Sequence, residues 1–164
     1  MTKALIPGTY DPVTLGHIDV IERAARVFSH VIVAVAASPQ KGAGPFFSLE
    51  ERTGFIKDAI AHLPNVEVHS FSSLLVNFAE EMHVDTIVKG LRAVTDFEWE
   101  FQQASINFQL NPKLETMFIM ANPRFMYLSS SMVKEIAAMG GDISHWVPPK
   151  VQRELAIRLG SEEH

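Results

Sequence analysis

The sequence contains no cysteine, and this absence excludes several kinds of chemistry at once. Disulfide bonds, thiolate metal sites and a cysteine nucleophile all need a thiol, so none of them can occur in this chain. Long apolar runs are absent too, since no stretch approaches the ~20 residues that a membrane-spanning helix needs. The apolar stretch within residues 1–7 is too short for a signal peptide. We therefore expect a soluble, cytoplasmic protein with no membrane partner.

Positive charge is also in short supply. The chain has 14 lysines and arginines against 19 aspartates and glutamates, which gives a formal net charge of -5. A protein with this balance does not attract nucleic acid or anionic lipid as a whole, so we expect no nucleic-acid partner. An enzyme for anionic substrates is compatible with this charge, provided that its few cations converge at one place.

The length and composition are those of an ordinary globular domain. The chain has 164 residues, of which 47% are hydrophobic and 20% are charged. A chain of this size buries roughly 70% of the surface that it exposes when unfolded, which is enough for one self-sufficient core. The sequence shows no internal repeat and no low-complexity tract. We therefore expect a single domain over residues 1–164.

Short β-branched runs alternate with amphipathic stretches along the chain. Residues 30–37 are nearly all apolar, which is typical of a strand buried on both faces of a parallel sheet. Strands are predicted at residues 3–6, 30–37, 66–70, 86–89 and 116–120, and helices at 15–28, 74–82, 96–110 and 131–139, with two more beginning near residues 48 and 148. This alternation predicts an α/β fold, a single Rossmann-like doubly wound domain with a five-stranded parallel sheet. Ligands of such sheets bind outside the carboxyl ends of the strands.

The loop after the first strand carries the residues of a phosphate site. Gly8 allows a close approach of the backbone, and Thr9 offers a hydroxyl. The amides that begin the helix at 15–28 attract anions. Gly16 leaves room on the first turn, and His17 can donate a hydrogen bond to a phosphate oxygen. Gly8 as a turn glycine and His17 as a surface histidine is the alternative, but the position of this histidine favours the phosphate site.

The motif at residues 8–17, Gly-Thr-Tyr-Asp-Pro-Val-Thr-Leu-Gly-His, resembles the signature of the nucleotidyltransferase superfamily whose ATP motif is His-x-Gly-His. Thr14 stands at the first histidine position, and Thr-x-Gly-His is similar to the motif of the bacterial phosphopantetheine adenylyltransferases. Four further segments agree with that family, in order and over nearly the whole chain: residues 38–41, 89–92, 96–100 and 129–134.

The resemblance implies a reaction and its partners. The family transfers the adenylyl group of ATP to 4′-phosphopantetheine, giving dephospho-coenzyme A and pyrophosphate in coenzyme A biosynthesis. It implies Mg²⁺ held mainly by the ATP phosphates and water, a homohexamer, and coenzyme A as a feedback inhibitor. The histidines of the chain lack ligand spacing, so we expect no metal site built from protein side chains.

The resemblance also implies roles for individual residues. His17 would be the catalytic residue that stabilises the transition state at the α-phosphorus. The residues that would bind phosphopantetheine are Thr9, Lys41, Leu75 and Lys89. The residues that would bind ATP are Thr9, Tyr10, His17, Gly90, Leu91, Arg92, Glu100, Phe125, Met126, Tyr127, Leu128, Ser129, Ser130 and Ser131.

Side-chain chemistry agrees with several of these roles. Arg92 and Lys134 carry charges that could neutralise a triphosphate, and residues 129–131 offer hydroxyls and amides at a helix start. Glu100 suits the hydroxyls of a ribose. From the residues alone, however, Lys41 could be a solvated loop lysine and Glu100 an exposed helix carboxylate.

Three other functions are consistent with parts of the sequence. Ser131 and Lys134 fit the Ser-x-x-Lys pattern of acyl-serine enzymes that recognise penicillin, and Ser105 begins a loose Ser-x-Asn, but the Lys-Thr-Gly element is missing. A sister enzyme would adenylylate nicotinate mononucleotide or transfer a cytidylyl group to an alcohol phosphate. A non-catalytic nucleotide sensor on the same fold is the third alternative.

Overall fold

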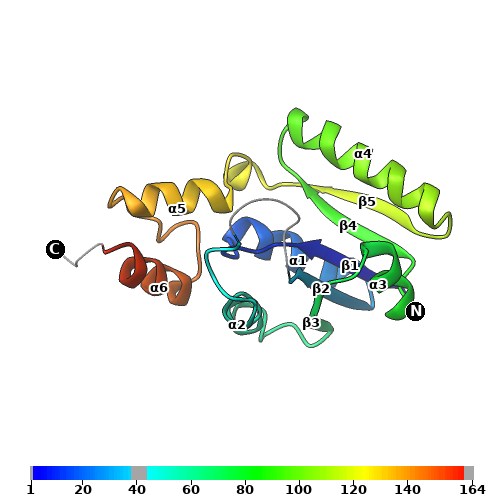
Figure 1. The fold of residues 1–164 in the computed structure, drawn as a ribbon, viewed down its shortest axis with the longest axis horizontal. Helices are drawn as coiled ribbons and strands as arrows, with labels where there is room; N and C mark the ends of the chain where they lie inside the picture. Colours follow the sequence, from blue (N-terminus) through cyan, green and yellow to red (C-terminus); the bar gives the residue numbers. More distant parts are fainter. Residues whose placement is uncertain (1, 38–43, 161–164) are drawn as a thin grey trace.

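The computed structural model describes residues 2–37 and 44–160, which form a five-stranded parallel sheet surrounded by helices (Figure 1). The strands are β1 (Lys3–Gly8), β2 (His30–Ala36), β3 (Val66–Phe71), β4 (Thr86–Leu91) and β5 (Glu115–Met120). The helices are α1 (Leu15–Val27), α2 (Leu49–Ala59), α3 (Leu75–Glu81), α4 (Val94–Leu110), the 3-10 helix η1 (Pro123–Phe125), α5 (Ser130–Ala138) and α6 (Pro149–Leu159). The predicted sheet and the predicted α/β alternation are confirmed.

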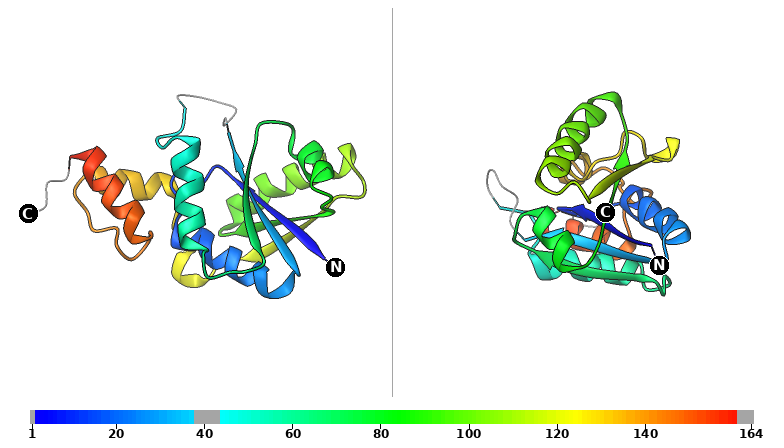
Figure 2. Two further views of the ribbon diagram at one scale, coloured as in Figure 1. Left: turned by 90° about the horizontal axis from the view of Figure 1, so that it is seen from below. Right: turned by 90° about the vertical axis from the view of Figure 1, so that its right-hand side faces the viewer.

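The alternation of side chains along β1 divides the core between the two faces of the sheet. Ala4 and Ile6 pack in one cluster with side chains of α1 and α2, whereas Leu5 packs in another with Phe78 of α3. Successive side chains of a strand point to opposite faces, so β1 is covered on both. Figure 2 shows α1 on one side of the sheet and α3 with α4 on the other. The sheet is therefore doubly wound, as its apolar strands predicted.

The strand order, β3-β2-β1-β4-β5, places a change of direction at the centre of the sheet. The chain moves outward from β1 to β3, then crosses back to β4 on the other side of β1. In open sheets of this kind, the crevice at such a change of direction binds the ligand. The carboxyl ends of the strands point toward α5 and α6 (Figure 1). The backbone therefore already locates the site between the ends of β1 and β4.

Several elements extend beyond their predicted limits. β1 continues to Gly8 because its register with β2 continues to Val35, and β4 continues to Leu91 opposite Met120 of β5. The pairing thus carries the glycine of the first motif to the end of a strand. The 3-10 helix η1 was not predicted. Within the described residues, no helix combines the length and the apolar character needed to cross a membrane.

We predict that Gly90→Ala destabilises the fold at this central position. A Cβ atom at residue 90 would lie 2.9 Å from Cγ2 of Val20 on α1, too close without a shift of the helix. Overpacking of this kind costs about 1–3 kcal/mol in the free energy of unfolding. Urea denaturation measures it. Gly54→Ala on α2 is the control, because its Cβ would meet no atom within 4 Å and alanine favours a helix interior by about 0.5–1 kcal/mol. Equal stability of both variants would contradict the prediction.

Candidate active site

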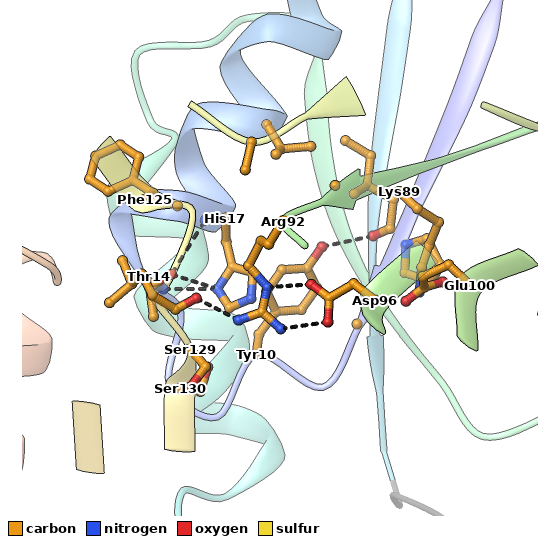
Figure 3. Close-up of a pocket in the computed structure, with 18 of the residues that line it drawn as sticks. Tyr10, Thr14, His17, Lys89, Arg92, Asp96, Glu100, Phe125, Ser129 and Ser130 are labelled. Carbon is orange, nitrogen blue, oxygen red and sulfur yellow. Dashed lines mark hydrogen bonds and ion pairs between the residues drawn. The ribbon is translucent and has the colours of Figure 1, made fainter. Parts of the chain in front are cut away.

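A cavity of roughly 370 Å³ opens where the carboxyl ends of β1 and β4 diverge. This volume is within the ~300–1,000 Å³ usual for small-molecule sites. Its walls are the end of β1, the first turn of α1, the end of β4, the start of α4 and the segment before α5 (Figure 3). The lining consists of Ile6, Pro7, Gly8, Tyr10, Thr14, Gly16, His17, Val20, Lys89, Gly90, Arg92, Asp96, Glu100, Ala121, Phe125, Leu128, Ser129, Ser130 and Ser131.

Tyr10 lines this cavity next to His17. Its backbone has a positive φ of 52°, and its ring lies so close over Gly8 that a Cβ there would be 2.9 Å from it. The hydroxyl donates a hydrogen bond to the carbonyl of Ile6 at 3.0 Å, and burial raises the pKa of the Tyr10 phenol. The ring meets the imidazole of His17 edge to face, with centroids 4.9 Å apart. The ring of Tyr10 therefore packs against the imidazole and restricts its position.

Thr14 and His17 form a reciprocal capping box at the start of α1. The backbone N–H of Thr14 donates to Nδ1 of His17 at 2.9 Å, and the amide of His17 donates to Oγ1 of Thr14 at 3.4 Å. Threonine is among the side chains that best cap a helix N-terminus, which gives the Thr-x-Gly-His spacing a structural reason. Because Nδ1 accepts a hydrogen bond, the ring proton of neutral His17 is on Nε2.

His17 stays neutral over a wide range of pH. Burial lowers the pKa of its imidazole to about 4, and the positive charges of Arg92 and then Lys89 act in the same direction. At neutral pH the ring therefore offers one fixed N–H donor and carries no charge. This donor lies among residues that line the cavity, next to the N-terminal turn of α1 (Figure 3).

Two cations line the cavity, and each is paired with a carboxylate of α4. Lys89 Nζ lies 3.2 Å from Oε2 of Glu100. The guanidinium of Arg92 forms a fork with Asp96, at 2.9 Å and 3.4 Å, and donates to the carbonyl of Leu128 at 2.5 Å (Figure 3). These contacts hold both cations at the carboxyl end of β4. Asp96 is a residue that the motif contained but to which sequence reasoning gave no role.

The three consecutive serines also serve the architecture. Ser129 caps α5, because its hydroxyl accepts the amide of Met132 at 3.1 Å. Ser130 donates to the carbonyl of Pro12 at 2.7 Å and so joins α5 to the loop that leads into α1. Ser131 is exposed, and all three line the cavity. The N-terminus of α5 therefore lies beside that of α1, and the two can present amides and hydroxyls to one anion.

Some predicted residues lie elsewhere. Leu75 packs on α3 in the cluster around Phe78. Tyr127 is 80% exposed. The carbonyl of Thr9 accepts a hydrogen bond from the buried Arg52, outside the cavity. Lys41 lies outside the described residues. The predicted residues that the structure describes but that do not line the cavity are Thr9, Leu75, Leu91, Met126 and Tyr127.

Lys134 has a different partner from the one expected. Its Nζ atom lies 3.2 Å from Oδ2 of Asp11. The carboxylate of Asp11 also accepts hydrogen bonds from two backbone amides, that of Phe46 on Oδ2 at 2.7 Å and that of Phe47 on Oδ1 at 2.8 Å. Lys134 is not part of the cavity lining, although its sequence position suggested a triphosphate contact. Short motifs give no signal for such a pair, because Asp11 and Lys134 are far apart in sequence and the fold alone brings them together.

The arrangement of an acyl-serine enzyme is not assembled. Ser105 lies on α4, where its hydroxyl donates to the carbonyl of Phe101 at 2.9 Å. Lys134 pairs with Asp11 and is therefore directed at the loop after β1. The two short patterns thus belong to different helices with separate partners. Among residues 2–37 and 44–160, no group of three or more histidine, aspartate or glutamate side chains is placed to hold a metal ion.

We predict that the His17 imidazole of the ligand-free protein remains unprotonated as the pH falls from 8 to about 5, because its pKa is about 4 rather than 6.5. The unfolded chain takes up this proton near pH 6.5, so acidification toward pH 4 favours unfolding. The contribution of neutral His17 to the free energy of unfolding is fully present above pH 6.5, and it is lost as the pH falls from there through 4. Nitrogen NMR shifts of the ring report both protonation and the Nε2–H tautomer. A midpoint near 6.5, or a proton on Nδ1, would contradict this geometry.

Comparisons with known proteins identify the family of this chain. A family model described as cytidylyltransferase-like matches residues 5–136. The chain is 53% identical over 157 residues to the phosphopantetheine adenylyltransferase of Thioalkalivibrio sulfidiphilus (strain HL-EbGR7), covering 96% of this chain and 98% of that protein. Among solved structures, a putative nicotinate-nucleotide adenylyltransferase from Vibrio parahaemolyticus has the same fold, with a TM-score of 0.68 at 19% identity over 94% of this chain and 99% of that one. The chain belongs to the cytidylyltransferase-like family and, within it, to the phosphopantetheine adenylyltransferases.

Proposed function

We propose that this protein transfers the adenylyl group of ATP to 4′-phosphopantetheine, forming dephospho-coenzyme A and pyrophosphate. The observation that carries the proposal is the convergence of neutral His17 with Lys89 and Arg92 in one cavity, at the N-terminal turn of α1. Although the chain has a net charge of -5, two of its cations, Lys89 and Arg92, line this one cavity, which is an arrangement that suits phosphorylated substrates. The name of its 53% identical relative supports the same reaction.

The reaction needs positioning more than proton transfer. An oxygen of the phosphopantetheine phosphate forms a bond to the α-phosphorus of ATP, while the bond from that phosphorus to the oxygen bridging to the β-phosphorus breaks. A phosphate monoester is already an anion near neutral pH, since its second pKa is about 6. The attacking group therefore has no proton that a base must remove, and pyrophosphate leaves as an anion. The protein contributes alignment and charge stabilisation.

His17 supplies a neutral donor for the charge that builds up on the α-phosphoryl oxygens. The Thr14 amide fixes the tautomer, and the ring of Tyr10 supports the imidazole, so the donor needs no reorganisation as the reaction proceeds. Ionic attraction is supplied by Lys89 and Arg92, which meet phosphate groups as fixed cations. Their carboxylate partners, Glu100 and Asp96, hold them at the end of β4 before a substrate enters.

Mg²⁺ is part of the proposal as the partner of the nucleotide. The two carboxylates of the cavity, Asp96 and Glu100, are engaged by Arg92 and Lys89, and this donor set fits a metal held mainly by phosphate oxygens and water. When bound with ATP, the metal neutralises part of the triphosphate charge. We expect Arg92 and the serines at the start of α5 to contact that charge, because they line the cavity.

A substrate panel tests the function directly. Phosphopantetheine, nicotinate mononucleotide and glycerol 3-phosphate are each combined with ATP and with CTP, and pyrophosphate release is measured. We expect rapid release only with ATP and phosphopantetheine. Preference for another acceptor or for CTP would indicate a sister enzyme, and nucleotide binding without any pyrophosphate release would indicate a sensor.

We predict that His17→Ala lowers turnover by ~10²–10³ while the affinities for both substrates change much less, as expected for a donor whose hydrogen bond strengthens in the transition state. Steady-state turnover and calorimetric affinities separate the two effects. Glu51→Ala is the control, because it removes the equivalent capping side chain from α2, away from the cavity. A loss confined to substrate affinity, or an equal loss of turnover in both variants, would remove His17 from the catalytic role.

We also propose that the protein is a homo-oligomer, with the hexamer of its family as the expected form. α4 is placed over β4 and β5 at the outside of the molecule (Figure 1), and it exposes more apolar surface than one core requires. Among the described side chains of α4, the large apolar ones that are exposed are Phe97, Trp99, Phe101, Ile106, Phe108 and Leu110, at 44–61% of their full exposure. Feedback inhibition by coenzyme A and location in the cytoplasm stay predictions.

We predict a particle of about six times the 18.3 kDa chain mass in light scattering at micromolar concentration. Trp99→Glu, at the most exposed of these apolar side chains of α4, should reduce that mass because it buries a charge in the interface. Ile157→Glu is the control, since Ile157 is 73% exposed on α6, a different helix. A monomeric wild-type protein would reject the oligomer, and an equal effect of both substitutions would place the interface elsewhere.

A further inference from the structure

One buried cation lies outside the cavity and has no part in the mechanism described above. Arg52 of α2 is 1% exposed, which makes it the most deeply buried charged residue in the described part of the chain. Its guanidinium donates to four backbone carbonyls: Phe47 O at 3.1 Å, Thr9 O at 2.8 Å, Ala36 O at 2.8 Å and Ala37 O at 3.2 Å. Burying such a charge without partners would cost several kcal/mol, so these contacts are needed to keep it there.

The four carbonyls belong to three separate segments. Thr9 follows β1, Ala36 ends β2 with Ala37 directly after it, and Phe47 precedes α2. The strand pairing between β1 and β2 stops at Gly8 opposite Val35. Beyond that pair, the hydrogen bonds of Arg52 to Thr9 and Ala36 join the segments that continue from β1 and β2, in place of hydrogen bonds between the strands. The planar guanidinium suits this geometry, because its five donors project in fixed directions.

A carboxylate of the same loop completes the arrangement. Asp11 is 7% exposed, and its negative charge acts on Arg52 against the effect of burial, which lowers the pKa of the guanidinium. Asp11 also accepts the amides of Phe46 and Phe47 and the ammonium of Lys134. The loop from Thr9 to Asp11 is thus held at both ends by buried charge. Thr14, which caps α1 and fixes His17, follows three residues later.

We propose that Arg52 is a positioning residue for adenylyl transfer: by holding the Thr9 carbonyl against the end of β2, it keeps the loop that leads to His17 in place. The proposal rests on the function proposed above. A displacement of about 1 Å in a loop next to the reacting groups can lower the rate by ~10². The loss should therefore appear in turnover, while the ATP contacts of Arg92 and α5, which Arg52 does not touch, remain.

The test compares Arg52→Lys with a control from the same helix. Lysine keeps the charge near Asp11, but a single ammonium cannot reach four carbonyls in the directions of the guanidinium. We expect turnover to fall by about ten-fold or more, with the KM for ATP nearly unchanged. Ile56→Val is the control, because Ile56 is fully buried in the core on α2 and its side chain makes no hydrogen bond to any of the four carbonyls, so the substitution lowers the melting temperature alone. Equal turnover losses in both variants, at matched loss of melting temperature, would overturn the positioning role.

A measurement on the wild-type protein decides the matter if Arg52→Lys does not fold. The guanidinium protons of Arg52 should exchange slowly with water in NMR spectra, both in the free protein and with 4′-phosphopantetheine and a non-reacting ATP analogue bound, because the loop is held before the substrates enter. Rapid exchange of these protons in either state would overturn the proposal. The panel on the wild-type protein keeps the two proposals apart. An inactive wild-type protein rejects the function and the positioning role with it, whereas an active wild-type protein and an equally active Arg52→Lys reject the positioning role alone.

Discussion

The hydrogen bond from the Thr14 amide to Nδ1 of His17, at 2.9 Å, is the contact on which the site depends. It begins α1 at a defined residue, because it is half of a capping box. It also determines which ring nitrogen carries the proton, and burial next to two cations keeps that ring uncharged. One contact therefore sets the helix start, the tautomer and the direction of the donor. The proposed transfer at the α-phosphoryl group needs all three in the same place.

The electrostatics of the cavity solve a problem that the composition poses. The chain has a net charge of -5, yet its proposed substrates carry phosphates. Lys89 lies in β4, where parallel pairing with β5 holds its backbone, and Arg92 directly follows the strand; α4 supplies a carboxylate for each. Paired cations stay ordered without a ligand, and Arg92 retains donors beyond those that Asp96 and Leu128 occupy. Local placement, and not overall charge, therefore produces an anion site.

Beyond the paired ends of β1 and β2, the buried charges of Arg52 and Asp11 bind the backbone groups that strand pairing no longer binds. Strand pairing ends at Gly8 and Val35, and from there Arg52 and Asp11 hold the segments that diverge from β1 and β2. Backbone carbonyls beyond a strand end need donors, and here the buried guanidinium of Arg52 supplies them. The carboxyl edge of the sheet is thus rigid where the functional loop departs, and α5 joins it through Ser130 and Lys134.

The sequence by itself determined the sheet, its alternation with helices and the edge where the site lies, because two-sided apolar strands and capped amphipathic stretches are local patterns. The Thr-x-Gly-His motif likewise predicted the phosphate end of α1, since a capping box spans only four residues. The partners of Lys134 and Arg52 were decided by the tertiary structure, and so were the contact of Arg92 with Leu128 and the outward position of Tyr127. These contacts depend on which segments, far apart in sequence, meet at the strand ends. The identity of a side chain does not indicate which of these segments will lie next to it. Lys134 shows the difference: its position in a motif suggested a phosphate contact, and the fold gave it to a carboxylate more than a hundred residues away.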